Sequence, residues 1–488
     1  MDKNYEKKKN QQNIKAKSDK CAVFGKCGGC QLLNMPYEAQ LQKKKDEVAK
    51  LLKPYCKVEK IIGMDKPWHY RNKVLASFSC DRRGVPVSGM YEENSHRVVP
   101  TDNCLLNDEK ADKIIVSIRG LLKSFKIKTY NEDTGYGLLR HVLVRVGKNS
   151  GQIMVVLVLA SPILPGKNNF VKALRNLHPE ITSMVINVNP RHSSAVLGDK
   201  EIVVYGPGFI EDTLQDKVFR ISPKSFYQIN PVQTEKLYST AIEFAGLRGQ
   251  ETVLDAYSGT GTIGICASGK AKKVVCVELN KDAVRDSIVN AKRNKVTNIE
   301  MYNQDAGEFM LKQAEANIKM DVVFMDPPRS GSDEKFLSSL CKHAPKKVVY
   351  ISCNPETLAR DLKFLTKHGY VAKKAVAVDM FPFTTHVETV VLLSQQKPDD
   401  VIEVEIELDE LDLTSAESKA TYKEIQEYVL KEHGLKVSNL YISQVKRKCG
   451  IEVGENYNLP KSEDSRQPQC PEEKEKAIKD ALEHFGMI

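Results

Sequence analysis

The sequence lacks the features that mark membrane and secreted proteins. No segment contains 18 or more consecutive apolar residues, which excludes a membrane-spanning helix. The first 20 residues hold seven lysines and three acids and have no apolar stretch, so they are not a secretory signal. Tryptophan occurs once, as Trp68, and indicates no function; no internal repeat is present. We therefore expect a cytoplasmic protein that does not associate with membranes.

Cysteine, by contrast, is frequent, and the charge is moderately basic. The chain has 488 residues and 12 cysteines, and at about 150 residues per domain this length predicts about three domains. Without an export signal, clustered cysteines indicate metal binding or catalysis and not disulfides. The net charge of +10 is compatible with a nucleic-acid partner, although many enzymes of neutral metabolites carry a similar charge.

The pattern of apolar residues changes along the chain. Residues 1–20 form a basic arm, typical of a disordered tail. Residues 21–223 hold a Cys/Gly segment, a helix over Tyr37–Leu52 and then short β-branched runs, which predict a mostly antiparallel β domain. In residues 224–394 strands alternate with helices. This alternation predicts an α/β fold with a doubly wound parallel sheet, whose ligands bind at the carboxyl ends of the strands.

Residues 395–488 form a separate extension whose role the sequence leaves open. Ile402–Leu408 alternates apolar and acidic residues, which predicts a half-buried strand. Tyr422–His433 and a segment capped by Ser438 and ending at Lys448 predict two short helices. The two helices resemble a helix-turn-helix, and a small helical appendage explains them equally well.

A cluster of cysteines opens the β-rich region. Cys21-Ala-Val-Phe-Gly-Lys-Cys27-Gly-Gly-Cys30 places three thiols within ten residues, and its glycines let the backbone wrap closely around a metal centre. Iron–sulfur and zinc sites both use four thiolates, and the spacing alone does not separate them. Candidates for the fourth ligand are Cys56, Cys80 and Cys104.

A glycine-rich turn follows the first strand of the alternating region. The segment Asp255–Gly264 contains a G-x-G-x-x-G pattern, which dinucleotide-binding and S-adenosylmethionine-binding folds share. Both folds need glycines where the ligand approaches the backbone. Both also place an acid after the next strand to bind ribose hydroxyls, and Glu278 stands at this position for either ligand.

Three later strand ends carry residues suited to chemistry on a base. Asp326-Pro-Pro-Arg329 is a rigid turn that can hold polar groups against the flat face of a base, as in methyltransferases. Cys353 follows a strand and can act as a thiolate nucleophile, although most lone cysteines are structural. Glu388 lies beside aromatic residues and can be a general base or a solvated acid.

Together these motifs resemble the RNA uracil-5-methyltransferases, which make 5-methyluridine from S-adenosylmethionine. They occur in the order found in that family and cover the chain from about Cys21 to Ser394. The matching elements are Ser225-Phe-Tyr-Gln228-Ile-Asn230, Asp255–Gly264, Asp326–Gly331, Ser352–Pro355 and His386-Val-Glu388-Thr.

The resemblance implies a role for each matching residue. Cys353 becomes the nucleophile that attacks C6 of uracil, and Glu388 becomes the acceptor of the C5 proton. The residues implied around the methyl donor and the base are Gln228, Tyr257, Glu278 and Asp326, with Asp305 on the adenine side. Phe381 and Phe383 are candidates to stack on displaced bases, with core packing expected for at least one of them.

The cysteines distinguish branches of the family. Cys21, Cys27, Cys30 and Cys104 match the four-thiolate pattern of the 23S ribosomal RNA branch, which carries a [4Fe-4S] cluster, whereas the transfer-RNA branch lacks it. The resemblance thus implies a monomeric enzyme that acts on 23S rRNA. Two departures are the absence of the N-terminal β-barrel domain of many relatives and the presence of the extension after Ser394.

Four other interpretations remain. A transfer-RNA uracil-5-methyltransferase keeps the chemistry and changes the substrate. A DNA or protein amino-methyltransferase explains the Asp-Pro-Pro turn but gives Cys353 no role. A nicotinamide oxidoreductase explains only the glycine-rich turn, and a non-catalytic RNA-binding protein uses the fold without its chemistry.

Overall fold

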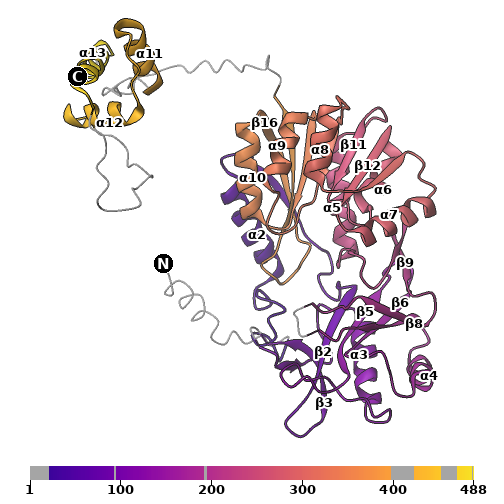
Figure 1. Cartoon of the computed structure of the whole chain (residues 1–488). Helices are drawn as coiled ribbons and strands as arrows, with labels where there is room; N and C mark the ends of the chain where they lie inside the picture. Colours follow the sequence, from indigo (N-terminus) through magenta and orange to yellow (C-terminus); the bar gives the residue numbers. More distant parts are fainter. Residues whose placement is uncertain (1–20, 93–94, 192–194, 397–421, 452–469, 486) are drawn as a thin grey trace. The chain divides into compact units, whose positions relative to one another are not determined.

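The structure is a computed structural model that describes residues 21–92, 95–191, 195–396, 422–451, 470–485 and 487–488 (Figure 1). The chain divides into two compact units, residues 1–400 and 401–488. The basic arm and the strand expected at Ile402–Leu408 lie outside the described residues. Among the helices that are described, none is both long and apolar enough to cross a membrane.

An eight-stranded mixed sheet forms the centre of the first unit. Five neighbouring strands, β15-β14-β11-β12-β13, run parallel, and β17 pairs antiparallel with β15 and with β16. This confirms the predicted α/β fold with its doubly wound parallel sheet. The strands are β11 (Thr252–Ala256), β12 (Lys273–Glu278), β13 (Ile299–Asn303), β14 (Val322–Met325), β15 (Lys347–Ser352), β16 (Tyr370–Val378) and β17 (Glu388–Gln395).

Helices cover both faces of this sheet, because its central strands are apolar runs buried on both sides. One face packs on α5 (Pro231–Ala245), α6 (Thr262–Ala267) and α7 (Lys281–Arg293). The other packs on α2 (Tyr37–Leu52), α8 (Ala306–Glu315), α9 (Glu334–His343) and α10 (Pro355–Lys367), with α2 and α10 side by side (Figure 1).

The first described strand belongs to a different domain from the one expected for its residues. β1 (Val58–Ile62) pairs parallel with β16 at the edge of the eight-stranded sheet, and α2 packs on the same sheet through Val48 and Leu52. We expected residues 21–223 to form one separate domain. That boundary is wrong for α2 and β1, because the periodicity of a segment does not reveal which distant strand it pairs with.

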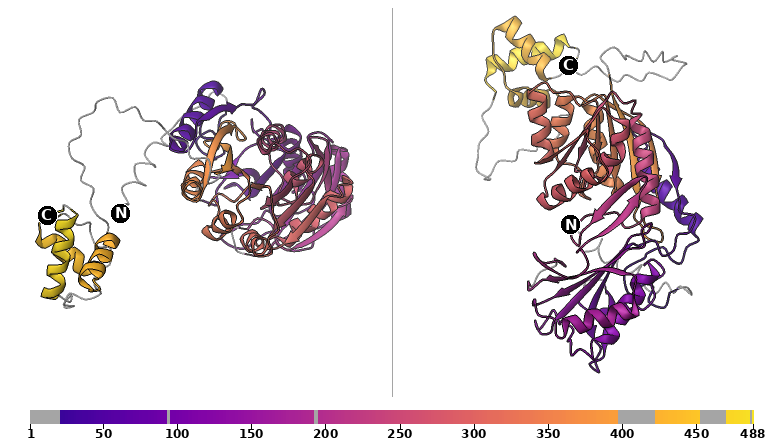
Figure 2. Two further views of the ribbon diagram at one scale, coloured as in Figure 1. Left: turned by 90° about the horizontal axis from the view of Figure 1, so that it is seen from above. Right: turned by 90° about the vertical axis from the view of Figure 1, so that its right-hand side faces the viewer.

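A second, seven-stranded sheet forms the central domain (Figure 2). Its order is β4-β3-β2-β5-β6-β7-β8, and every pair is antiparallel except β6 with β7, as predicted for a mostly antiparallel domain. The strands are β2 (Lys73–Cys80), β3 (Pro86–Tyr91), β4 (Val98–Pro100), β5 (Leu139–Val146), β6 (Ile153–Leu159), β7 (Ile181–Val188) and β8 (Lys200–Tyr205).

The two sheets share apolar packing. One face of the central sheet is covered by α3 (Glu109–Leu121) and α4 (Lys167–Leu177), and α4 is the crossover between the parallel strands β6 and β7. The other face packs on the hairpin β9 (Ile210–Leu214) and β10 (Lys217–Ile221) in one continuous core with α5 and α6. The central domain is therefore fixed against the eight-stranded sheet.

The second unit is a bundle of helices with its own core. It contains α11 (Tyr422–His433), α12 (Asn439–Lys448) and α13 (Glu472–His484), which pack through apolar residues such as Ile425, Ile442 and Ile478. The side chain of Ser438 accepts a hydrogen bond from the N–H of Tyr441, which confirms the expected N-cap. The third helix was not predicted from the sequence.

Candidate active site

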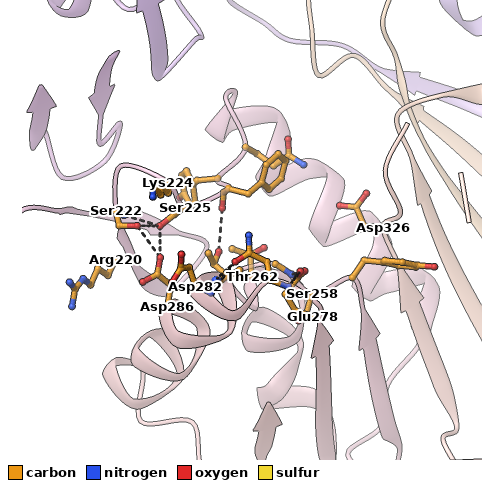
Figure 3. Close-up of a pocket in the computed structure, with 18 of the residues that line it drawn as sticks. Arg220, Ser222, Lys224, Ser225, Ser258, Thr262, Glu278, Asp282, Asp286 and Asp326 are labelled. Atoms are coloured by element: carbon orange, nitrogen blue, oxygen red, sulfur yellow. Dashed lines mark hydrogen bonds between the residues drawn. The ribbon is translucent and has the colours of Figure 1, made fainter. Parts of the chain in front are cut away.

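A cavity of about 1050 Å³ opens at the carboxyl edge of the parallel strands. Its wall continues to β8 of the central domain and includes both catalytic candidates. In Figure 3, Asp326 lies on the right and Asp286 on the left, with Ser258 and Glu278 between them. The predicted residues that line the cavity are Gln228, Tyr257, Glu278, Asp326, Cys353 and Glu388.

The backbone of the glycine-rich turn lines one side of the cavity. Tyr257, Gly259 and Gly261 all have positive φ, at 62°, 54° and 77°, before α6 begins at Thr262. Gly259 has open space where a Cβ would be, so a ligand can approach its backbone. Gly264 serves packing, because a Cβ there would lie 2.6 Å from Cys276 Sγ.

Glu278, the last residue of β12, is hydrogen-bonded to the glycine-rich turn. Its two carboxylate oxygens accept hydrogen bonds from the N–H groups of Gly259 (2.9 Å) and Asn280 (2.7 Å). An ionised carboxylate can accept about four hydrogen bonds, so capacity remains for two hydroxyl donors. This arrangement suits the ribose of a nucleoside ligand.

The Asp326 turn and the Cys353 turn are connected. The Asn354 side chain caps α10 by accepting from the N–H of Glu356, and it donates to the carbonyl of Arg329 (3.1 Å). Cys353 lies between β15 and this cap. The sheet edge therefore presents the thiol and the Asp-Pro-Pro turn at one place in the cavity.

The pKa values of the acids in the cavity are raised. Burial raises the pKa of Asp326 to about 7. Burial, with Asp326 nearby, raises the pKa of Glu388 to about 8 against the opposing effect of Arg329. Burial and the two carboxylates raise the pKa of Cys353 to about 11. At neutral pH, Cys353 and Glu388 therefore favour their neutral forms, and about half of Asp326 is ionised.

Glu388 has the properties of a general base. It is the first residue of β17, only 3% of its surface is exposed, and its Oε2 has no hydrogen-bond partner among the described residues. A carboxylate with a free oxygen and a pKa near neutrality can accept a proton from a bound ligand.

The central domain positions the loop that carries Gln228. Arg145 on β5 donates from Nη2 to the carbonyls of Ser225 (2.5 Å) and Pro223 (3.2 Å). Asn72 donates to the carbonyl of Gln228 (3.1 Å). Sequence reasoning missed Arg145 and Asn72, because neither belongs to a motif.

Asp305 is not part of the cavity wall. Its side chain caps α8 by accepting a hydrogen bond from the N–H of Glu308 (2.9 Å). An aspartate directly before a helix is a strong capping signal in its own right, and this local role accounts for its position. The expected place on the adenine side is therefore not supported by the cavity.

The two phenylalanines considered for base stacking have different environments. Phe381 lines the cavity. Phe383 is 1% exposed and stacks on Trp68, with 4.0 Å between ring centroids. The structure therefore assigns Phe383 to core packing, as expected for at least one of them, and gives Trp68 a structural role.

The four predicted cluster cysteines line one small cavity. Cys21, Cys27, Cys30 and Cys104 all face it, whereas Cys56 and Cys80 do not. Burial and the neighbouring thiols of Cys104 and Cys27 raise the pKa of Cys30 to about 12. Within the described ranges, no three His, Cys, Asp or Glu side chains are arranged to hold a single metal ion.

Comparison with known proteins decides the family. The profile of the tRNA (Uracil-5-)-methyltransferase family matches residues 36–396, which include the eight-stranded sheet and the whole cavity. This chain belongs to that family.

Similar proteins support the assignment. The methyltransferase is 43% identical over 378 residues to an "Uncharacterized RNA methyltransferase" of Halalkalibacterium halodurans, covering 76% of this chain and 82% of the relative. A relative from Listeria monocytogenes with the same description is 42% identical over 379 residues, 76% of this chain and 83% of the relative. The protein is thus an S-adenosylmethionine-dependent RNA methyltransferase.

A solved structure resembles most of this chain. The tRNA (uracil-54, C5)-methyltransferase of Pyrococcus abyssi, in complex with S-adenosyl-L-homocysteine, has a TM-score of 0.63 and 29% sequence identity. The match covers 75% of this chain and 86% of the other. The fold of this methyltransferase is therefore the Rossmann-like fold of a known RNA methyltransferase.

Proposed function

We propose that this methyltransferase makes 5-methyluridine in 23S ribosomal RNA through a covalent bond between Cys353 and C6 of uracil. The observation that carries the chemistry is the presence of a thiol and a buried base, Cys353 and Glu388, on the wall of one cavity that also contains the glycine-rich turn. Pure binding of RNA or of a cofactor requires neither group.

The chemistry follows from the weak nucleophilicity of uracil C5. The Cys353 thiol loses its proton to solvent, and the resulting thiolate adds to C6 and places a pair of electrons on C5. C5 uses this pair to take the methyl group from the sulfonium of the bound donor, which leaves as S-adenosylhomocysteine. After C5 has taken this methyl group, Glu388 accepts the C5 proton. The electrons of the broken C–H bond form the C5–C6 double bond, and the thiolate leaves C6. A covalent intermediate thus divides one difficult step into easier ones.

The cavity is large enough for a donor and a base together. Ligand sites commonly have 300–1000 Å³, and this cavity has about 1050 Å³. A base must leave its stack to enter, which costs a few kcal/mol and favours a single-stranded or looped RNA. Phe381 on the cavity wall is the proposed surface for stacking on the displaced base.

The cysteine cavity supports ribosomal RNA as the substrate. We propose that Cys21, Cys27, Cys30 and Cys104 hold a [4Fe-4S] cluster, as in the 23S rRNA branch. The irons of such a cluster are bound by separate cysteine thiolates, and the four cysteines that line this cavity are the residues that would supply them. A zinc ion bound by the same four cysteines is the alternative that the iron content tests.

Transfer RNA is the second candidate substrate. It is favoured by the similarity to the P. abyssi tRNA (uracil-54, C5)-methyltransferase. The decisive experiment offers unmodified 23S rRNA and unmodified tRNA in parallel to protein purified without oxygen, with labelled S-adenosylmethionine and nucleoside mass spectrometry. We expect 5-methyluridine in the rRNA alone. Product in tRNA alone would overturn the substrate while keeping the chemistry, and product in neither would overturn the proposed function.

The covalent step has its own test. Glu388→Gln removes the base, so the methylated adduct cannot eliminate the thiol. We expect a protein–RNA band of reduced mobility in denaturing gels. Its absence in a variant that turns over like the wild type would remove Glu388 from the role of base.

The cluster is tested by its iron. We expect about four irons and four sulfides per protein after anaerobic purification, and a loss of both in Cys104→Ser. Cys80→Ser is the matched control, because this exposed cysteine lies outside the small cavity. Zinc in place of iron, or unchanged iron in Cys104→Ser, would contradict the proposed site.

A further inference from the structure

The loop between β16 and β17, residues 379–387, leads directly into the proposed base. Glu388 pairs with Val378 in the antiparallel ladder, so Asp379 and Val387 are the two ends of the loop at the last rung. Within the loop, Phe381 lines the active cavity. Whatever holds Asp379 therefore fixes the end of the ladder that presents the Glu388 carboxylate.

A buried ion pair holds this loop from the side of α2. Lys44 Nζ lies 2.6 Å from Asp379 Oδ1, and the two side chains are 1% and 0% exposed. Lys44 also donates to the carbonyl of Phe381 (3.1 Å), and Tyr37 donates to Asp379 Oδ2 (2.7 Å). A third side chain of the same helix, Gln40, accepts from the N–H of Phe383 (3.1 Å).

These three helix residues form one polar stripe. Tyr37, Gln40 and Lys44 recur at the spacing of one face of an α-helix. A helix face that packs against a protein core is normally apolar, and fully buried lysine is rare. On α2, Gln40 and Lys44 are buried and Tyr37 is half-buried. Val48 and Leu52 on the following turns pack in the apolar core.

Stability alone does not explain a buried ion pair. Removing two charges from water costs so much that a well-packed apolar pair in their place is often equally stable or more stable. What charges provide and apolar groups do not is a defined geometry, because each hydrogen bond fixes a distance and a direction. Here all the bonds of Lys44 and Tyr37 to the loop end at Asp379 or Phe381, next to the reacting groups.

We propose that Lys44 and Asp379 are positioning residues that hold Glu388 in register for removal of the C5 proton. The inference rests on the proposed function. It predicts a specific defect: a variant without the pair still forms the covalent adduct and still transfers the methyl group, but it eliminates the product slowly.

The test uses the full-length protein and follows the adduct. In Lys44→Met we expect the band of reduced mobility to accumulate during turnover, a fall of about 10- to 100-fold in kcat for product release, and a nearly unchanged Kd for S-adenosylmethionine. Lys44→Arg should restore part of the turnover, because it keeps a cation at the site. Lys43→Met is the matched control, since Lys43 is its exposed neighbour on the same helix and pairs only with Glu47 in the described contacts.

Two further variants separate positioning from stability. Leu52→Ala weakens α2 through packing alone, so it should lower Tm without accumulating adduct. Lys44→Met combined with Asp379→Leu leaves no unpaired buried charge and should fold even if the single variant does not. We expect this double variant to accumulate adduct, because the loop has lost the bonds that Lys44 and Tyr37 make to the Asp379 carboxylate and the bond of Lys44 to the carbonyl of Phe381.

The outcomes distinguish a failure of the proposed function from a failure of the positioning role of Lys44 and Asp379. If the wild type, run in parallel, makes no 5-methyluridine and Glu388→Gln forms no adduct, the proposed function fails. If Glu388→Gln forms the adduct while the folded double variant turns over like Lys43→Met, the positioning role is overturned. Accumulation of adduct in Leu52→Ala to the same extent would also overturn it, because any loss of stability would then produce the defect.

Discussion

At the scale of single residues, the active cavity contains buried acidic side chains whose negative charges are only partly balanced by nearby basic groups. Asp326 and Glu388 have pKa values raised to about 7 and about 8, and Cys353 has a pKa raised to about 11. The buried Oε2 of Glu388 has no hydrogen-bond partner within the described part of the chain. Such a site favours a cationic ligand, and the sulfonium of the methyl donor is a cation.

The first prediction concerns the pH dependence of binding. The carboxyls are neutral below their raised pKa values, so a cation binds weakly at low pH and more tightly as pH rises through about 7 to 8. We expect S-adenosylmethionine binding at pH 7 to release protons. Calorimetry in buffers of different ionisation enthalpy measures this release. S-adenosylhomocysteine, which has no sulfonium, is the control; equal proton release for both ligands would contradict the prediction.

The second prediction concerns the nucleophile. Cys353→Ala should reduce methyl transfer by on the order of 10³-fold or more, because Cys353 is the only thiol among the described residues that line the cavity. Donor affinity should change little. Cys341→Ala is the matched control, since Cys341 is also half-buried but lies outside the cavity wall. Radiolabel transfer and equilibrium binding measure the two quantities. Substantial residual transfer would exclude the covalent route through Cys353.

The sequence predicted the cavity residues that follow strand ends, and there is a physical reason for this. Parallel strands end at one edge of their sheet, so Glu278, Asp326 and Cys353 meet although they are far apart in the chain. The Lys44–Asp379 pair could not be found in this way. Its members are 335 positions apart, and neither follows a glycine-rich or proline-rich turn at a parallel strand end.

At the scale of elements, caps and turns decide where the functional side chains lie. Asn230, Asn280 and Asn354 each cap the helix that follows a cavity loop, which fixes the start of α5, α7 and α10. These boundaries are readable from a sequence, because a capping residue needs only its own helix. The pairing of β1 with β16 was not readable, because it depends on a partner beyond any local pattern.

The third prediction separates two roles for Asp305. If it only caps α8, Asp305→Ala should destabilise the protein by about 0.5–2 kcal/mol, and Asp305→Asn, which also caps, should retain stability. Neither change should alter the Kd for S-adenosylmethionine. Thermal unfolding and equilibrium binding measure these effects. A loss of donor affinity in Asp305→Asn at normal Tm would return Asp305 to the adenine site.

At the scale of the whole molecule, the chain contains two units with separate apolar cores. The first unit unites the eight-stranded sheet and the central domain through a shared core, whereas the helices α11, α12 and α13 pack on one another. The sequence predicted the extension as a separate piece and two of these helices. It could not predict how the central domain is joined to the catalytic sheet, because that contact is made by apolar residues of ordinary pattern.

The fourth prediction follows from the separate cores. A protein that ends at residue 400 should keep the main unfolding transition within about 2 °C and bind S-adenosylmethionine with unchanged affinity, because no core residue of the first unit has been removed. Differential scanning calorimetry and equilibrium binding measure both quantities. A large fall in Tm would show that the extension supports the catalytic unit, and altered methylation at normal Tm would locate an RNA-related role in it.

The parallel pairing of β1 with β16 has a consequence for the way this protein is made. The strand that completes the edge of the catalytic sheet leaves the ribosome more than 300 residues before its partner, Val58 facing Ala375. Closing so long a loop is slow, and until then the β16 edge is open to pairing with other chains. Expression of a fragment that starts at residue 224 would leave that edge open permanently. Such a fragment should aggregate, whereas one that starts at Cys21 should not.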